Sequence, residues 1–139
     1  MEKPRTKRTK KMTPVLSVNA IEPVLPFWVD RLGFQKTVEV PEGDRLGFVI
    51  LVKGGVEVMY QSWASIEKDV PQMAKEPRGT TFLFLEIEPA DFDELVKQLE
   101  GTEVVLPVRK TFYGAREVGV REPGGNIVTF AAFEQAPPK

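Results

Sequence analysis

The sequence contains no cysteine and no histidine. The absence of cysteine excludes disulfides, thiolate metal sites and cysteine nucleophiles. The absence of histidine removes the commonest general base and the commonest metal ligand, and it excludes a Ser-His-Asp triad. The chain also lacks a glycine-rich phosphate loop between a strand and a helix, and it has no Gly-x-Ser-x-Gly motif. Any catalysis would therefore depend on carboxylates and other side chains.

Long hydrophobic runs are also missing. No segment has the length and apolar character of a transmembrane helix, so we expect no membrane partner. The N-terminus has no apolar stretch typical of a secretory signal, which favours a cytoplasmic protein. The 139 residues suffice for one domain, and 42% hydrophobic and 28% charged residues are typical of a globular protein.

Charge is unevenly distributed along the chain. Six of the 19 basic residues but only one of the 20 acidic residues lie in 1–12, which leaves residues 13–139 with a net charge of −6. A basic tail can contact nucleic acid or an acidic surface. It can also be a solvated leader, and we favour this reading because no aromatic residue interleaves the tail to stack on bases. The acidic domain itself is not expected to bind nucleic acid.

Two halves of the chain have the same predicted order of elements. Apolar residues at helical spacing predict helices over 22–31 and 90–100. With the predicted strands, the first half has strands at 14–19, 34–40, 46–52 and 56–61, and the second has strands at 80–88, 104–109, 116–121 and 126–133. A polar connector, 62–79, separates the two. The pattern predicts a duplicated β-α-β-β-β module.

Glycine motifs recur at matching places in this frame. Each half has an apolar strand that enters a Gly-Gly turn and an apolar strand that leaves it, at Gly54-Gly55 and Gly124-Gly125. Leu32-Gly33-Phe34 follows the first helix, and Tyr113-Gly114 and Glu122-Pro123 precede the last turn. In this order the motifs resemble those of the vicinal oxygen chelate superfamily, which includes glyoxalase I, bleomycin-resistance proteins and extradiol dioxygenases. The resemblance covers residues 13–133.

The resemblance implies an α+β fold. The duplicated β-α-β-β-β modules, 13–61 and 80–133, would form an open, cup-like mixed-sheet barrel with helices outside and a ligand cavity inside. The basic tail 1–12 and a C-terminal tail, 134–139, would flank this domain. The resemblance further implies a homodimer whose cavities lie near the subunit boundary.

Members of this superfamily that use a metal take their ligands from the first and last strands of each module, usually as His and Glu. Carried onto this sequence, those positions are Thr13, Glu57, Phe82 (or Thr81, if the register slips by one) and Thr129. Of these, only Glu57 binds metal well, whereas a catalytic ion normally needs three protein ligands. The two-His-one-carboxylate iron site is impossible without histidine. We therefore expect no metal and no other cofactor.

Strand alternation predicts which side chains face the cup. Glu57 and Met59 share one face of their strand, Phe82 and Phe84 point inward from the next module, and Thr129 joins them. Trp63 can edge the cavity or cover the core. Arg121 can anchor an anionic group or lie at the rim in solvent. We expect ligand contacts from these seven residues: Glu57, Met59, Trp63, Phe82, Phe84, Arg121 and Thr129.

These residues favour a protein that binds or sequesters a small, mostly hydrophobic organic molecule. Glu57 would then hold water or a cationic or hydrogen-bond-donating group of the ligand. The alternative is an enzyme of the lyase or isomerase type, either with unusual metal ligands or metal-free with Glu57 as the base. A second alternative is a non-catalytic interaction module, which a tightly packed cup would favour.

Overall fold

The structure is a computed structural model that describes residues 8–134, so most of both predicted tails lies outside the described residues. It contains two four-stranded mixed sheets with the strand orders β1-β4-β3-β2 and β5-β8-β7-β6. The first and last strands of each module run parallel, as β1 with β4 and β5 with β8. The topology of the first module is therefore repeated in the second, as the sequence predicts.

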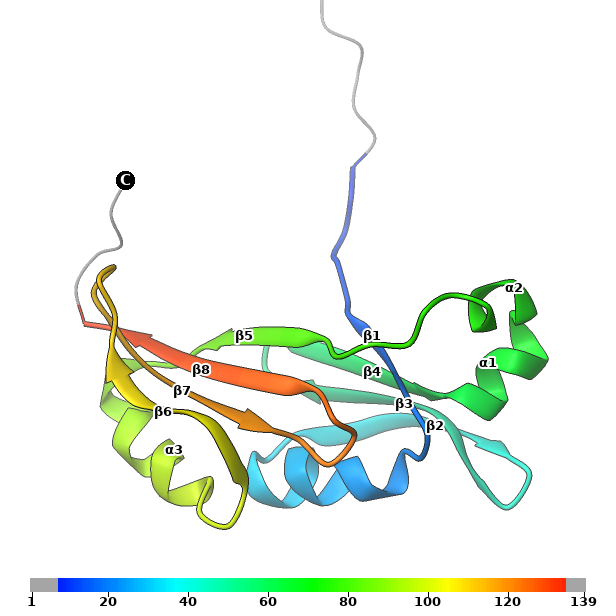
Figure 1. Ribbon diagram of the computed structural model, residues 1–139, viewed down its shortest axis with the longest axis horizontal. Helices are drawn as coiled ribbons and strands as arrows, with labels where there is room; N and C mark the ends of the chain where they lie inside the picture. Colours follow the sequence, from blue (N-terminus) through cyan, green and yellow to red (C-terminus); the bar gives the residue numbers. More distant parts are fainter. Residues whose placement is uncertain (1–7, 135–139) are drawn as a thin grey trace, which may run out of the picture.

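The strands agree closely with the predicted ones. Sheet A contains the strands β1 Val15–Val18, β2 Gln35–Glu42, β3 Arg45–Lys53 and β4 Val56–Ser62. Sheet B contains the strands β5 Phe82–Glu86, β6 Glu103–Lys110, β7 Ala115–Arg121 and β8 Ile127–Phe133. The helical segments 22–31 and 89–98 pack on one side of the sheets, and the opposite side is left open except at one end, where the helices that follow β4 rise beside it (Figure 1). Over the described residues the strands do not close into a barrel, which matches the expected open cup.

The first helix is not a regular α-helix. A 3₁₀ turn, η1 Glu22–Val24, leads into a π-helical segment, η2 Pro26–Arg31. Pro26 lacks the N–H that an α-helix would need at this point, so the predicted helix over 22–31 divides here. The apolar residues still face the sheet, because Val24, Phe27 and Trp28 are all buried.

The predicted polar connector 62–79 is partly helical, which the sequence analysis missed. It contains α1 Trp63–Asp69 and α2 Pro71–Ala74. The Ser62 hydroxyl accepts a hydrogen bond from the Ser65 N–H at 3.2 Å and caps α1, and Ile66 is buried beneath it. Trp63, Ile66, Val70 and Met73 do recur at helical spacing, but Pro71 interrupts the pattern and only Ile66 is buried in these two helices. The second module has 3₁₀ turn η3 Pro89–Asp91 and helix α3 Phe92–Gln98.

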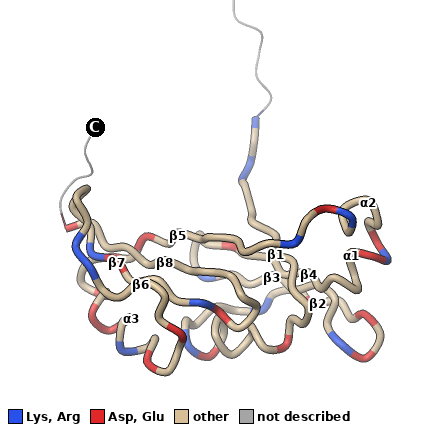
Figure 2. Tube along the Cα trace, viewed as in Figure 1, with Lys and Arg blue, Asp and Glu red and all other residues tan. Residues whose placement is uncertain are grey.

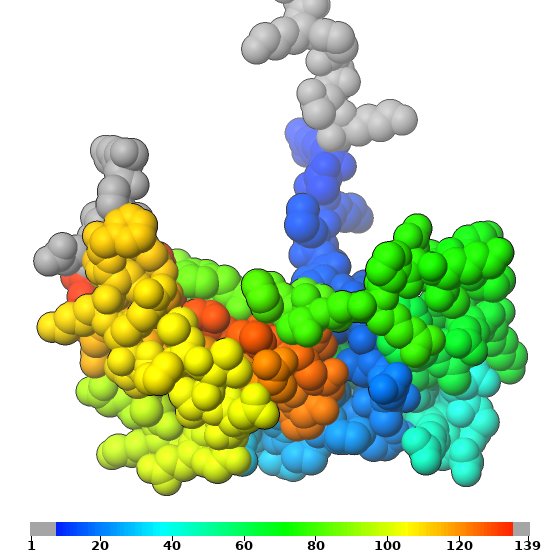
Figure 3. Space-filling view, in the orientation of Figure 1, coloured from blue at the N-terminus to red at the C-terminus, as the bar shows by residue number. Residues whose placement is uncertain are grey.

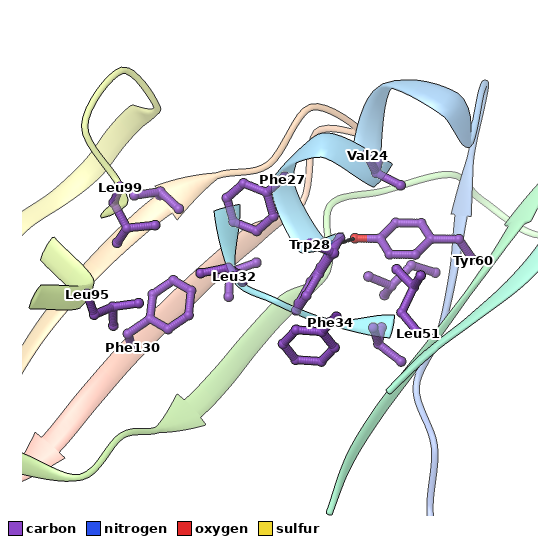
Figure 4. Close-up of a cluster of buried hydrophobic side chains, with 14 of the residues drawn as sticks. Val24, Phe27, Trp28, Leu32, Phe34, Leu51, Tyr60, Leu95, Leu99 and Phe130 are labelled. Carbon is purple, nitrogen blue, oxygen red and sulfur yellow. Dashed lines mark hydrogen bonds between the residues drawn. The ribbon is translucent and has the colours of Figure 1, made fainter. Parts of the chain in front are cut away.

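The hydrophobic core lies between the helical elements and the covered face of the sheets. Trp28 is at its centre, edge-on to Phe27 and Phe34 with ring centroids 5.4 and 4.9 Å away (Figure 4). Leu95 and Phe130 from the second module belong to the same cluster of buried side chains. Both modules therefore share one core.

A buried hydrogen-bond chain also joins the modules. The Trp28 indole N–H donates to the Tyr60 hydroxyl at 2.9 Å, and that hydroxyl donates to a Glu122 carboxylate oxygen at 2.5 Å. The other Glu122 oxygen accepts from the Asn126 backbone N–H at 2.7 Å. Burial and the neighbouring carboxylate raise the pKa of Tyr60, so this phenol remains a donor. A buried carboxylate is thus satisfied by groups from both modules.

Gly124 allows the Glu122 turn to approach the first module. A Cβ at position 124 would lie 2.7 Å from Val18 Cγ1 and 3.0 Å from both Glu122 carboxylate oxygens.

None of the helices among residues 8–134 is both long and apolar enough to cross a membrane.

We predict that Tyr60→Phe lowers the free energy of unfolding by about 1–3 kcal/mol, because it leaves Glu122 Oε2 without its donor and the Trp28 N–H without its acceptor. Urea denaturation followed by circular dichroism measures this. Tyr113→Phe is the comparison variant, since Tyr113 also donates to a carboxylate, Glu117, but the Tyr113 side chain is partly exposed and Glu117 keeps Arg109 as a partner. An equal loss of stability in both variants would contradict the special role of the buried chain.

Candidate functional site

The open face of the two sheets carries most of the predicted site residues. Met59 pairs with Val15 of β1 and Ile50 of β3, which places these three side chains on the face away from the helices. In sheet B, Phe84 pairs with Thr129. Phe82 is 76% exposed and Phe84 is 55% exposed, so two phenylalanines lie open on this face. The exposure of these large apolar side chains makes the open face a candidate binding surface.

Glu57 lies on the same face but does not have a free negative charge. The Lys11 ammonium donates to both Glu57 oxygens at 3.0 Å, and the Thr13 hydroxyl donates to Oε1 at 2.9 Å. These contacts lower the pKa of Glu57, with the hydrogen bond from Lys11 as the largest cause. The sequence analysis assigned Lys11 to the tail. Lys11 thus occupies the place beside Glu57 where the sequence analysis expected a cationic group of a ligand.

The position of Lys11 follows from the path of the chain before β1. The segment leading into β1 rises from the open face, opposite the helices, and carries successive basic residues (Figures 1 and 2). Pro14 is fixed to the sheet through its carbonyl, which accepts from the Met59 N–H at 3.0 Å. The Lys11 side chain therefore lies close enough to the sheet to contact Glu57.

Trp63 and Arg121 have other partners. The Arg78 guanidinium lies over the Trp63 ring at 4.1 Å from its centroid, so one ring face is covered. Arg121 donates to Glu103 at 2.8 Å and to the Gly125 carbonyl at 3.0 Å. It lines a cleft of about 400 Å³ that also includes residues of η2. These contacts favour the rim interpretation of Arg121.

A hollow of about 640 Å³ lies at the α1 end of sheet A. Val40, Phe48 and Gln61 form part of its wall, and all three project from the open face. Ser65 and Lys68 of α1 complete it, and the Gln61 amide donates to the Ser65 hydroxyl at 3.1 Å. Helix α1, which the sequence analysis missed, therefore forms one side of this hollow.

At the other end of the open face, β7 places a buried carboxylate beside two polar side chains. Glu117 is 2% exposed and accepts from Arg109 and from the Tyr113 hydroxyl. Sequence analysis did not single out Arg109, Tyr113 or Phe133. One pattern in the sequence could have located this site. Arg109 and Glu117 lie eight residues apart across a predicted hairpin, a spacing that favours a cross-strand ion pair.

Comparison with protein families gives one decisive match. A model of the Glyoxalase/Bleomycin resistance protein/Dioxygenase superfamily matches residues 12–130. The chain belongs to this superfamily. A search of curated protein sequences gave no match.

Solved structures of superfamily members share the fold. A glyoxalase/bleomycin resistance protein/dioxygenase from Nocardioides aligns over 98% of this chain and 91% of its own, with 23% identity and a TM-score of 0.76. Lactoylglutathione lyase from Agrobacterium tumefaciens aligns over 91% and 96%, with 16% identity and a TM-score of 0.73. TioX from Micromonospora sp. ML1 aligns over 89% and 98%, with 20% identity and a TM-score of 0.70.

The metal positions of the superfamily are occupied by residues that do not fit a metal ion. Glu57 and Thr13 are close together, but the ammonium of Lys11 holds both carboxylate oxygens. Phe82 offers no donor atom, and Phe84 rather than Phe82 pairs with Thr129. No group of three acidic side chains that could hold a metal is found within residues 8–134. A metal ion would have to displace Lys11 and accept a single carboxylate.

We predict that the protein purified without chelator contains no stoichiometric Ni, Zn, Mn or Fe, as measured by elemental analysis. Glu57→Ala is the control, because it removes the only strong donor at these positions. Stoichiometric metal in the wild type that is lost in Glu57→Ala would contradict the prediction.

Proposed function

We propose that this superfamily member binds or sequesters a small, mostly hydrophobic organic molecule on its open face, without a metal ion. The observation that carries the proposal is the exposure of Phe82 and Phe84 on that face. Burying an aromatic side chain against a ligand is favourable, and exposed apolar patches often mark binding sites.

The shape of the open face supports a ligand of small size. Helices α1 and α2 on one side and the β6–β7 loop on the other rise above the strands between them (Figure 3). The hollow beside α1 combines the apolar side chains of Val40, Pro41 and Phe48 with polar and charged ones, which are Glu42, Gln61, Ser65, Lys68 and Asp69. A concave site that combines apolar walls with polar groups suits a small organic molecule.

The rival function is a lyase or isomerase reaction, a possibility raised by the name of the Agrobacterium relative. Without a metal it would need Glu57 as its base. A general base works best when its pKa is near the working pH, but Lys11 and Thr13 lower the pKa of Glu57. The contact between Lys11 and Glu57 therefore favours a protein that binds its ligand over one that catalyses a reaction with Glu57 as the base.

We predict that Phe84→Ala weakens binding of a hydrophobic ligand by about 1–3 kcal/mol, the scale for burying an aromatic side chain. A small-molecule thermal-shift screen followed by titration calorimetry measures this. Glu57→Gln is the control, since Lys11 already neutralises the Glu57 carboxylate, and only ligands with a cation or donor should respond to it. If a ligand binds the wild type and both variants with equal affinity, its pocket lies elsewhere on the protein.

We also propose that the protein is a homodimer whose contact includes part of the open face. Five apolar side chains on this face are 41–76% exposed: Val15, Val38, Val40, Phe82 and Phe84. Exposed apolar side chains of this kind are commonly covered by a partner subunit.

We predict that light scattering coupled to size exclusion gives twice the chain mass of 15.6 kDa. Phe82→Asp should shift the protein towards monomer, because it places a charge in the contact. Met73→Asp is the matched control, since Met73 is 61% exposed on α2, away from the sheets. A wild-type monomer, or equal behaviour of both variants, would contradict this interface.

A further inference from the structure

Arg109, Tyr113 and Glu117 form a compact polar cluster at the β6–β7 end of the open face, which we call the Arg109 cluster. Arg109 donates to Glu117 Oε1 from Nε at 2.8 Å and from Nη2 at 2.5 Å. The Tyr113 hydroxyl donates to Glu117 Oε2 at 2.6 Å. The Glu117 side chain is only 3% exposed, so these two partners, rather than water, compensate its negative charge.

The Arg109 guanidinium is held in place but not saturated. It has five N–H groups, and Glu117 takes two of them. Within residues 8–134, Tyr113 is the one other side chain near enough to share these donors, and the Arg109 side chain is 53% exposed. The contact with Glu117 raises the pKa of Arg109, so its positive charge persists. A buried carboxylate thus orients an arginine whose free edge faces solvent.

Strand register places this arginine on the open face. Arg109 pairs with Glu117, which in turn pairs with Ala131 of β8. The neighbouring residues of the hairpin face the other way, because Arg116 stacks on Phe92 of α3 at 4.7 Å. Lys110 pairs with Arg116 and therefore belongs to the opposite face.

A row of aromatic rings leads from the predicted ligand site to the Arg109 cluster. The ring centroids of Phe84 and Phe133 are 6.5 Å apart, those of Phe133 and Tyr113 are 5.9 Å apart, and those of Tyr113 and Phe112 are 5.1 Å apart. Tyr113 belongs to both groups, so the aromatic row ends at the arginine. Phe112 at the tip is 97% exposed.

We propose that this end of the open face binds the anionic oxygen group of an aromatic ligand, with Arg109 as the anchor and the row of Phe84, Phe133 and Tyr113 as the surface for its rings. The inference rests on the proposed function, and it names the chemistry of the ligand. A guanidinium edge binds the two oxygens of a carboxylate or sulfonate in parallel, and rings of the ligand pack on aromatic faces.

The charges around the row favour an anion over a cation. Glu117 is buried and paired with Arg109, and Glu57 is paired with Lys11. Glu86, the other acidic side chain on this face of β5, is exposed to water, which screens its charge. Of the charged groups beside the aromatic row, Arg109 is therefore the one whose N–H groups can still donate to a ligand.

Two fluorescent probes of similar ring structure test the proposal. 8-Anilinonaphthalene-1-sulfonate is an aromatic anion, and N-phenyl-1-naphthylamine has the same rings without the charge. We expect Arg109→Met to weaken sulfonate binding at least tenfold and to change binding of the neutral probe less than twofold. Lys110→Met is the matched control, because it removes the same charge one residue away on the opposite face, and it should change neither affinity.

Loss of Arg109 alone leaves the buried Glu117 carboxylate short of a partner, which can destabilise the fold. The double variant Arg109→Met/Glu117→Gln removes both charges and keeps an acceptor for Tyr113. It should be folded by circular dichroism and show the same selective loss of sulfonate binding. Phe84→Ala should weaken both probes, because both use the aromatic row.

The outcomes separate the two proposals. If the neutral probe binds and responds to Phe84→Ala, but sulfonate affinity is unchanged in the folded double variant, the anion site is wrong and the proposed function stands. If neither probe binds the wild-type protein, the open face does not take aromatic ligands and both proposals fail. Equal losses of sulfonate binding in Lys110→Met and Arg109→Met would indicate a general effect of charge and overturn the assignment to Arg109.

Discussion

The relative position of the two modules depends on the buried contact between Tyr60 and Glu122. Each module has its own sheet, but a phenol from one donates to a carboxylate from the other at 2.5 Å, inside the shared core. A buried carboxylate without such a donor is costly, so alternative placements of the modules lose this compensation. Gly124 permits this close approach, because a Cβ at its position would lie 2.7 Å from Val18 Cγ1.

Charge neutralisation within the chain gives the open face its chemical character. Two of the acidic side chains that strand alternation aims at this face, Glu57 and Glu117, have internal cations as partners, Lys11 and Arg109. They differ in burial, because the Glu57 side chain is 20% exposed whereas that of Glu117 is 3% exposed. The exposed pair contributes little to stability, but the buried carboxylate orients its arginine firmly. This difference explains why the cluster at Arg109, rather than Glu57, offers a defined anchor to a ligand.

The superfamily frame and the chemistry of this chain follow from different residues. The glycine turns and apolar strands that define the fold match the superfamily over residues 12–130. The positions that the resemblance assigns to metal ligands, by contrast, contain Thr13, Phe82 and Thr129 beside a single carboxylate. A phenylalanine at a ligand position exchanges a donor atom for apolar surface, which suits the binding of rings better than the binding of an ion. The same cup can thus serve a different purpose without a change of topology.

Several features were accessible from the sequence alone. The repeated order of elements, the Gly-Gly turns and the alternation in the strands determined the duplicated fold and the inward face of Glu57, Met59, Phe82 and Phe84, because period-two patterning is local. Only the tertiary structure decided the rest. Helix α1 depends on the cap at Ser62 and on one buried anchor, Ile66, and the division of the first helix depends on Pro26. The contacts of Lys11 with Glu57, of Tyr60 with Glu122 and of Phe84 with Phe133 join residues 46 or more positions apart. Such pairings carry no periodic signal, since they arise from the packing of whole modules.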